Sequence, residues 1–194
     1  MERNELYPIF LKVNQLDVLI VGGGNVGLEK LSFLLKSSPN ANVDLVSIDF
    51  LEELVTLANL HPHVNLIQKA YDISDLEKRH FIIGCTDNLD VNLQINKDAK
   101  AKHLLVNIAD TPDQCDFYLG GVVTKGHVKI AISTNGKSPT TAKRLRQLFE
   151  EIIPENITEM VSNLNVYRKT LKGDFQNKVD EMNKITEGLV SKKK

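Results

Sequence analysis

The sequence has little that would support disulfide bonds, a structural metal or a membrane segment. It has only two cysteines, Cys85 and Cys115, which lie far apart and outside any CxxC pattern. No apolar run approaches the roughly 20 residues that a membrane-spanning helix needs. The amino-terminal stretch MERNELYPIF lacks the basic start and apolar run of a secretion signal. We therefore expect a protein of the cytoplasm without disulfides or a membrane span.

An excess of charge of either sign is also missing. Lysine and arginine number 24, aspartate and glutamate 25, and the net charge is −1. Proteins that bind nucleic acids or membrane surfaces usually carry a basic face, so we expect neither partner, although a local basic cluster remains compatible with this balance. The histidines are scattered, and neither HExxH nor GxSxG occurs. We expect no dedicated metal site.

Apolar residues make up 42% of the 194 residues, enough for a sizeable core. In the first half, short apolar runs alternate with segments of helical periodicity, a pattern typical of a parallel sheet with helices on both faces. The expected helices cover residues 26–36, 51–60 and 89–102. The expected strands cover residues 17–21, 43–48, 64–68, 81–84 and 104–108.

The pattern changes after Pro112. Residues 117–124 and 128–133 are strand-like and flank Lys125-Gly126-His127, which predicts a hairpin. Ser138-Pro139 predicts a helix start, and the chain then reads as helical with breaks at Pro154 and Gly173. We expect three parts: an α/β domain over residues 1–112, a small segment over 113–147 and a helical domain over 148–194.

Four glycines follow the first apolar run, in the stretch VLIVGGGNVGLEK. Gly22, Gly24 and Gly27 form a GxGxxG pattern between an expected strand and an expected helix. In that context the first glycine permits a tight turn, the second lets a pyrophosphate approach the backbone, and the third lets helix and strand pack closely. The pattern predicts a Rossmann-type dinucleotide site at the helix amino terminus. The alternative is a glycine-rich turn without a ligand.

Asp49 ends the second expected strand, about 20 residues after the glycines, as a dinucleotide site requires. A carboxylate there accepts hydrogen bonds from ribose hydroxyls and repels a 2′-phosphate, and no arginine stands beside it. This favours NAD over NADP. The alternative role for Asp49 is to cap the helix that follows.

Further polar residues follow strands at the same expected edge of the sheet. Thr86-Asp87-Asn88 comes after the fourth strand, where it can bind a ligand or cap the next helix. Asp110 comes after the fifth strand, where a carboxylate can accept a proton or orient a substrate. The alternative for Asp110 is an ordinary turn residue before Thr-Pro.

A polar loop leads into a basic helix further along the chain. The loop holds Ser133, Thr134, Asn135 and Lys137, and Lys143 and Arg146 follow on neighbouring positions of one helix face. A helix amino terminus with such a cluster suits a polycarboxylate or a phosphate. The alternative is a solvated helix face.

Taken in order, these stretches resemble the siroheme synthase N-terminal family. The resemblance covers nearly the whole chain and is carried by the stretches YPIF, VGGGNVGLEK, CTDN, VNIAD, CDFYLGGVV and AISTNGKSPTTAKRLR. It implies an NAD-binding Rossmann domain, a dimerisation segment over residues 113–147 and a helical domain, joined in a homodimer. The chain departs from the family at Thr134, where a serine is usual, and at Gly120, where a proline is frequent.

The resemblance also implies roles for single residues. The cofactor positions of the family fall on Asn25, Val26, Ile48 and Asp49, with Thr86 nearby, and the aspartate associated with catalysis falls on Asp110. The implied reaction is the NAD-dependent dehydrogenation of precorrin-2 to sirohydrochlorin, in siroheme and thus porphyrin biosynthesis. The eight carboxylates of that substrate match the basic cluster. Two alternatives stay open: an enzyme that also inserts iron into sirohydrochlorin, and a non-catalytic NAD-responsive binding module.

Overall fold

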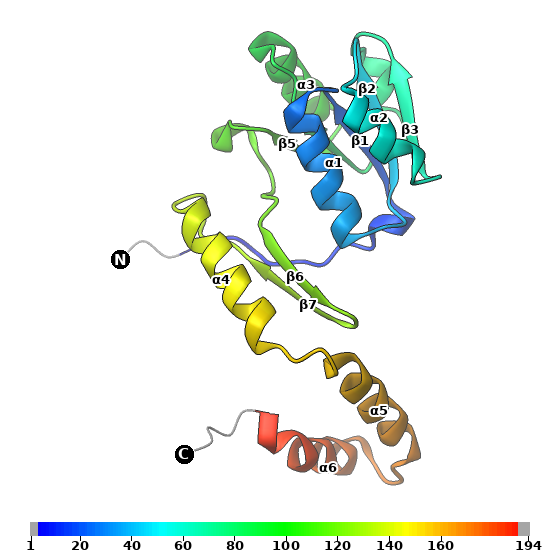
Figure 1. Cartoon of the computed structure of the whole chain (residues 1–194), viewed down its shortest axis with the longest axis vertical. Helices are drawn as coiled ribbons and strands as arrows, with labels where there is room; N and C mark the ends of the chain where they lie inside the picture. The colour runs from blue at the N-terminus through cyan, green and yellow to red at the C-terminus, as the bar shows by residue number, and fades with distance from the viewer. Residues whose placement is uncertain (1–3, 190–194) are drawn as a thin grey trace. The chain divides into compact units, whose positions relative to one another are not determined.

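The computed structural model describes residues 4–189 of the chain (Figure 1). The chain forms two compact units. The first holds the chain up to Gly120 together with Ser133–Ser138, and the second holds Gly121–Ile132 and the chain from Pro139 onward. The expected division into three parts stays a prediction.

The first unit is built on a five-stranded parallel sheet with the strand order β3-β2-β1-β4-β5. Every strand expected in the first half is present, and the bounds agree to within one residue. The chain runs outward from β1 to β3 and then returns to start β4 on the other side of β1, so the direction of winding reverses between β1 and β4. The strands are β1 (Asp17–Val21), β2 (Asn42–Ser47), β3 (Val64–Gln68), β4 (Phe81–Gly84) and β5 (Leu105–Ile108).

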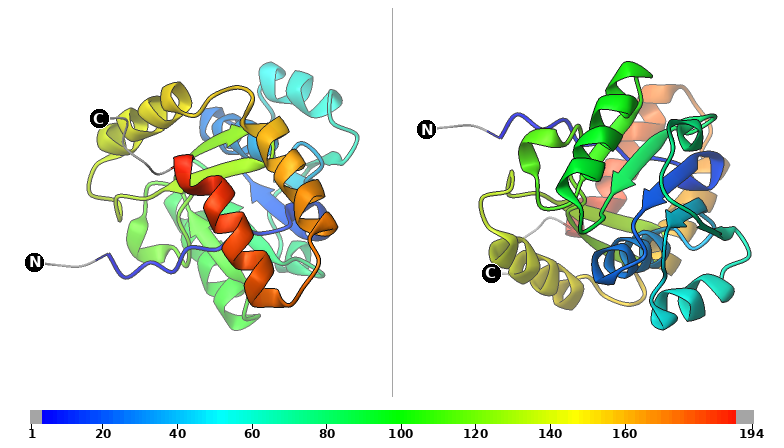
Figure 2. Two further views of the ribbon diagram at one scale, coloured as in Figure 1. Left: turned by 90° about the horizontal axis from the view of Figure 1, so that it is seen from below. Right: turned by 90° about the horizontal axis from the view of Figure 1, so that it is seen from above.

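Helices cover both faces of this sheet, as Figure 2 shows. The helices α1 (Asn25–Ser37) and α2 (Glu52–Asn59) pack on one face, and α3 (Leu89–Ala101) packs on the other. The last four residues of β1 are at most 2% exposed, because the strand is buried from both sides. The β3–β4 connection contains no α-helix, only the short 3₁₀ helix η2 (Ile73–Leu76).

The free edge of β5 is covered by the segment that follows it. The Asp116 N–H donates to the Val106 carbonyl at 2.8 Å, and the Val106 N–H donates to the Asp116 carboxylate at 3.1 Å. The amide of the buried Asn107 side chain donates to the Phe117 carbonyl at 2.7 Å. These bonds satisfy backbone groups that an exposed edge strand would leave open.

Within the residues that the structure describes, the second unit contains a two-stranded antiparallel hairpin, three α-helices and the short 3₁₀ helix η4 (Glu187–Leu189). The hairpin strands are β6 (Gly121–Lys125) and β7 (Val128–Ile132), and the helices are α4 (Pro139–Ile152), α5 (Ile157–Thr170) and α6 (Phe175–Thr186). The breaks expected at Pro154 and Gly173 are confirmed. The expected start of the first hairpin strand at Phe117 is wrong, because the Phe117 ring packs edge-on against Phe81, with centroids 5.4 Å apart, and holds its segment in the first unit.

The turn between β1 and α1 is built around close backbone contacts. Gly22 has φ +124°, a conformation that glycine adopts easily. A Cβ at Gly27 would lie 2.0 Å from the Gly22 carbonyl oxygen, so only glycine lets α1 pack this close to the turn. Gly24 differs from both, because a Cβ there would meet no atom within 4 Å and its φ of −85° suits any residue.

This contrast predicts that two alanine substitutions differ strongly in their effect on the free energy of unfolding. Gly27→Ala forces a methyl group against a backbone carbonyl and should lower the free energy of unfolding by about 3 kcal/mol. Gly24→Ala should change it by no more than about 0.5 kcal/mol. Urea unfolding followed by circular dichroism measures both, and equal midpoints for the two variants would contradict the packing described above.

Candidate dinucleotide-binding site

A cavity of about 870 Å³ opens at the carboxyl ends of the strands, beside the glycine turn. In open α/β sheets ligands bind at this edge, where the direction of winding reverses. The cavity is lined by seven of the eight residues predicted to bind the cofactor, namely Gly22, Gly24, Asn25, Val26, Ile48, Asp49 and Thr86. The eighth, Gly27, is not in the lining and supports the turn from within α1.

The amino terminus of α1 faces this cavity with its first residues, Asn25 and Val26. The capping position is Gly24, so no side chain caps the helix, and its first turn contains no acidic residue. The first backbone N–H groups of a helix have no partner within the helix, and they carry the positive end of its dipole. The arrangement suits a pyrophosphate, and the empty space over Gly24 leaves room for it to approach the backbone.

Asp49 lies just after β2, with an exposed side chain that lines the cavity. The alternative role as a helix cap does not apply, because α2 begins at Glu52, its capping position is Leu51, and no side chain caps it. The turn that carries Asp49 is tied to the glycines, since the Leu51 N–H donates to the Gly23 carbonyl at 3.0 Å. The backbone that carries Asp49 is therefore fixed beside the glycine turn, and its carboxylate is open to solvent.

Thr86 is held by the buried Asn92 side chain. The Thr86 hydroxyl lies 2.8 Å from the Asn92 amide oxygen, and the Asn92 amide nitrogen donates to the Thr86 carbonyl at 3.0 Å. The capping role considered for this stretch belongs to Asn88, whose side chain accepts from the Asp90 and Val91 N–H groups at the start of α3. Asp87 and Asn88 also line the cavity, so capping and cavity lining coexist here.

Asp110 follows β5 at the same edge of the sheet but is not among the residues that line the cavity. Its side chain is exposed, and its φ of +58° is uncommon for a residue other than glycine. The turn around it is fixed from both sides by the segment that covers β5. The Cys115 sulfur lies 3.2 Å from the Ile108 carbonyl oxygen and 3.3 Å from the Thr111 carbonyl oxygen, on either side of Asp110. Asp110 is thus a carboxylate at the sheet edge, held in a strained backbone conformation.

The residues predicted to bind the substrate divide between the two units. Ser133, Thr134, Asn135 and Lys137 belong to the first, and Lys143 and Arg146 belong to α4 in the second. The loop folds on itself, since the Thr134 hydroxyl donates to the Ser138 carbonyl at 3.1 Å and the Asn135 N–H donates to the Ser133 hydroxyl at 3.1 Å. Arg146 is paired with Glu150 one turn further along α4, whereas Lys143 is exposed.

The cavity has a further wall that the sequence analysis missed. Lys69, Ala70 and Tyr71 follow β3, and Gln94 lies on α3. The signal for the first three was present in the sequence, because β3 ends at the same edge as the strands that precede Asp49 and Thr86. Gln94 carries no such signal, since only the packing of α3 brings it to the cavity.

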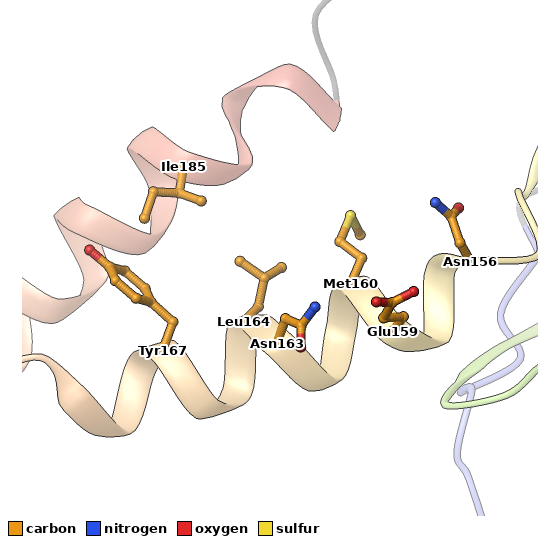
Figure 3. Close-up of a pocket in the computed structure, with 7 residues that line it drawn as sticks. All are labelled: Asn156, Glu159, Met160, Asn163, Leu164, Tyr167 and Ile185. Atoms are coloured by element: carbon orange, nitrogen blue, oxygen red, sulfur yellow. The ribbon is translucent and has the colours of Figure 1, made fainter.

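A second cavity, of about 490 Å³, lies between α5 and α6 within the second unit (Figure 3). Figure 3 shows Tyr167 and Leu164 on α5 pointing toward Ile185 on α6. None of its lining residues is basic, so it does not suit an anionic substrate. They are Asn156, Glu159, Met160, Asn163, Leu164, Tyr167 and Ile185.

Residues 4–189 show neither a metal-binding cluster nor a membrane-spanning helix. These residues contain no group of three or more histidine, cysteine, aspartate or glutamate side chains placed to hold a metal ion. Their helices are all too short or too polar to cross a membrane.

Comparisons with known proteins agree with the dinucleotide geometry. The profile of a family described as "Putative NAD(P)-binding" matches residues 9–121, and one described as "Sirohaem biosynthesis protein central" matches residues 125–152. The siroheme synthase of Pseudoalteromonas translucida is 35% identical over 173 residues, covering 89% of this chain and 36% of that protein. The siroheme synthase of Baumannia cicadellinicola is 31% identical, covering 89% of this chain and 37% of that protein.

This chain therefore spans little more than a third of the length of these relatives. A solved structure titled "SirC, precorrin-2 dehydrogenase" matches with a TM-score of 0.72 over 93% of this chain and 89% of that one, at 23% identity, and shares its fold. The prediction of a Rossmann-type domain that binds a nicotinamide dinucleotide is confirmed. With matches over residues 9–121 and 125–152, this chain belongs to the siroheme synthase N-terminal family.

Proposed function

We propose that this protein is an NAD-dependent dehydrogenase that converts precorrin-2 to sirohydrochlorin in siroheme biosynthesis. The observation that carries the proposal is the cavity in which the uncapped amino terminus of α1 and the Asp49 carboxylate meet. We take the substrate from the proteins that this chain is similar to. The relatives are named siroheme synthases, and the structural match is titled a precorrin-2 dehydrogenase. Both cysteines are free thiols, which supports a place in the reducing cytoplasm.

The residues of the cavity fit NAD better than NADP. Asp49 can accept hydrogen bonds from the ribose hydroxyls and would repel a 2′-phosphate. The lining contains one lysine and no arginine, and that lysine, Lys69, lies 2.6 Å from the Asp75 carboxylate. The one basic side chain of the lining is therefore already paired with a carboxylate, which does not favour binding of a 2′-phosphate at the ribose. When bound, NAD would supply the hydride acceptor, and the N–H groups of α1 would hold its pyrophosphate.

Removing the Asp49 carboxylate should weaken NAD binding and leave NADP binding nearly unchanged. A hydrogen bond to a charged acceptor contributes about 1.5–3 kcal/mol, so Asp49→Ala should raise the Kd for NAD by roughly 10- to 100-fold. Titration of each cofactor, followed by calorimetry, measures the two constants. An equal loss for NAD and NADP would count against the ribose role.

Asp110 is the proposed proton acceptor or orienting group for the substrate. Its strained backbone and exposed carboxylate at the sheet edge support this role. The residue also stands outside the cofactor cavity, which separates its role from cofactor binding. Proton loss from the substrate accompanies hydride removal, so a base at this edge would serve the reaction.

Asp110→Asn keeps the size of the side chain and removes its ability to take a proton. We expect kcat for precorrin-2 oxidation to fall by about 10²- to 10⁴-fold, with the Kd for NAD near that of the wild type. Absorbance spectroscopy of the tetrapyrrole with NAD measures the rate. Asp113→Asn, an exposed carboxylate in the same loop, is the matched control. A rate for Asp110→Asn within a few-fold of wild type would rule out an essential base.

The same assay separates chemistry from substrate binding. We propose that Ser133, Thr134, Asn135, Lys137, Lys143 and Arg146 bind the substrate carboxylates. Lys143 is the sharpest test among them, because it is exposed and makes no salt bridge within residues 4–189, whereas Arg146 is paired with Glu150. Lys143→Gln should raise KM several-fold and reduce its salt dependence, with kcat nearly unchanged. Arg144→Gln is the control. Equal KM values for both variants would indicate that the basic residues of α4 only face solvent and do not bind the substrate.

We also propose that two copies of the chain form a homodimer. The amino-terminal segment before β1 leaves several apolar side chains open to solvent, including Tyr7 at 88% and Phe10 at 66% exposure. Large exposed apolar patches are rare on monomeric proteins and mark interaction surfaces, and these exposed side chains lie within a few positions of one another in the sequence. Sedimentation should give twice the chain mass of 21.7 kDa, and a Tyr7→Ser/Phe10→Ser variant should dissociate more readily. A wild type of single-chain mass would refute the dimer.

A further inference from the structure

A buried carboxylate contacts the wall of the cavity that Lys69, Ala70, Tyr71 and Gln94 form. Asp98 on α3 is 8% exposed, and its two oxygens accept hydrogen bonds from two different segments. The Tyr71 hydroxyl donates to Asp98 Oδ2 at 3.1 Å, and Gln94 Nε2 donates to Asp98 Oδ1 at 2.7 Å. A buried carboxylate needs such donors, and the bond from Tyr71 ties the loop after β3 to α3, whereas the bond from Gln94 lies within α3.

Both donors line the cavity, whereas Asp98 does not. Burial and, in second place, the hydrogen bond to Asp98 raise the pKa of the Tyr71 hydroxyl, so the phenol stays protonated and continues to donate. The contact with Asp98 therefore fixes the positions of two side chains that line the cavity.

The contact also fixes the orientation of the Gln94 carboxamide, because its nitrogen and not its oxygen faces Asp98. A carboxylate only accepts hydrogen bonds, so it must face the Gln94 nitrogen. Gln94 Oε1 is then left as an acceptor, and it accepts no hydrogen bond from the residues that the structure describes. The cavity thus has an oriented acceptor beside the apolar surfaces of Ala70, Tyr71 and Val91.

The order of the strands indicates which part of a dinucleotide would meet this wall. The pyrophosphate belongs at the α1 amino terminus beside β1, and the ribose belongs at Asp49 after β2. Tyr71 follows β3, the next strand outward. In the dinucleotide, the base is attached to this ribose on the side away from the pyrophosphate. The base would therefore lie next to the loop after β3, which contains Tyr71.

We propose that Gln94 is a specificity-determining residue for the base of the dinucleotide and that Asp98 is its positioning residue. This inference rests on the proposed use of NAD. Adenine carries an exocyclic amino group, which donates to an oriented acceptor such as Gln94 Oε1. In a purine that carries an oxygen in place of this amino group, that oxygen and Gln94 Oε1 are both acceptors and cannot form a hydrogen bond with each other. The apolar side chains contact the faces of the ring and do not distinguish the two bases.

The test compares NAD with nicotinamide hypoxanthine dinucleotide, in which an oxygen replaces the amino group. Calorimetry gives the Kd of each for the wild-type chain. We expect NAD to bind roughly tenfold more tightly, because the analogue leaves the Gln94 acceptor unpaired. A wild-type ratio near one would overturn the inference and leave the proposed NAD-dependent function standing. Failure to bind NAD at all would overturn both.

Variants then assign the discrimination to residues. Gln94→Leu should bring the ratio of the two Kd values close to one, and its exposed position leaves folding intact. Asp98→Asn offers one acceptor to two donors, so Gln94 loses its fixed orientation and the ratio should fall to an intermediate value. Leu93→Ala, a neighbouring exposed residue outside the cavity lining, should keep the wild-type ratio.

The ratio separates positioning from general support of the fold. If Asp98 served only stability, Asp98→Asn would weaken both dinucleotides equally and leave the ratio unchanged, which would overturn its positioning role. A wild-type ratio in Gln94→Leu would overturn the specificity role of Gln94, even if Asp98→Asn failed to fold.

Discussion

The carbonyl oxygen of Gly22 lies where a side chain at residue 27 would have to be, and much of the first unit depends on this contact. It brings the first turn of α1 against the end of β1. The amino terminus of the helix therefore opens into the cavity, with Gly24 unshielded at its entrance. A helix packed one side-chain layer further away would carry the same dipole but would leave its N–H groups out of reach of a ligand held at the strand ends.

Most of the fold and seven of the 21 residues that line the cavity could be predicted from the sequence, because local patterns encode them. Apolar runs and glycine spacing mark β1, β2 and β4, and Asp49 and Thr86 follow these strands directly. The place of Gln94 in the cavity and the Asp98 contact behind it could not be predicted, since the packing of α3 against the loop after β3 brings together Tyr71 and Asp98, 27 positions apart. The buried aspartate on α3 reads in the sequence like any charged residue of a solvated helix face.

The end of the first unit shows a second reason for a wrong prediction. Residues 117–120 have the composition of a strand, and Gly121–Lys125 does form one. The preceding residues instead pair with β5 through Asn107 and Asp116 and place Phe117 against Phe81. Burial of an aromatic ring and closure of a sheet edge outweigh strand propensity, which depends strongly on context.

The topology of the sheet has a consequence for folding. The pairing of β1 with β4 joins residues such as Asp17 and His80, which lie 63 positions apart, whereas β1 and β2 meet across a single helix. Closing the longer loop costs more chain entropy, so this pairing is the demanding step in assembling the sheet. The same pairing brings the Cys85 carbonyl against Gly22 and Thr86 to the cavity. A dinucleotide in solution would therefore select chains in which the two halves of the sheet have joined, and would act as a folding ligand as well as a reactant.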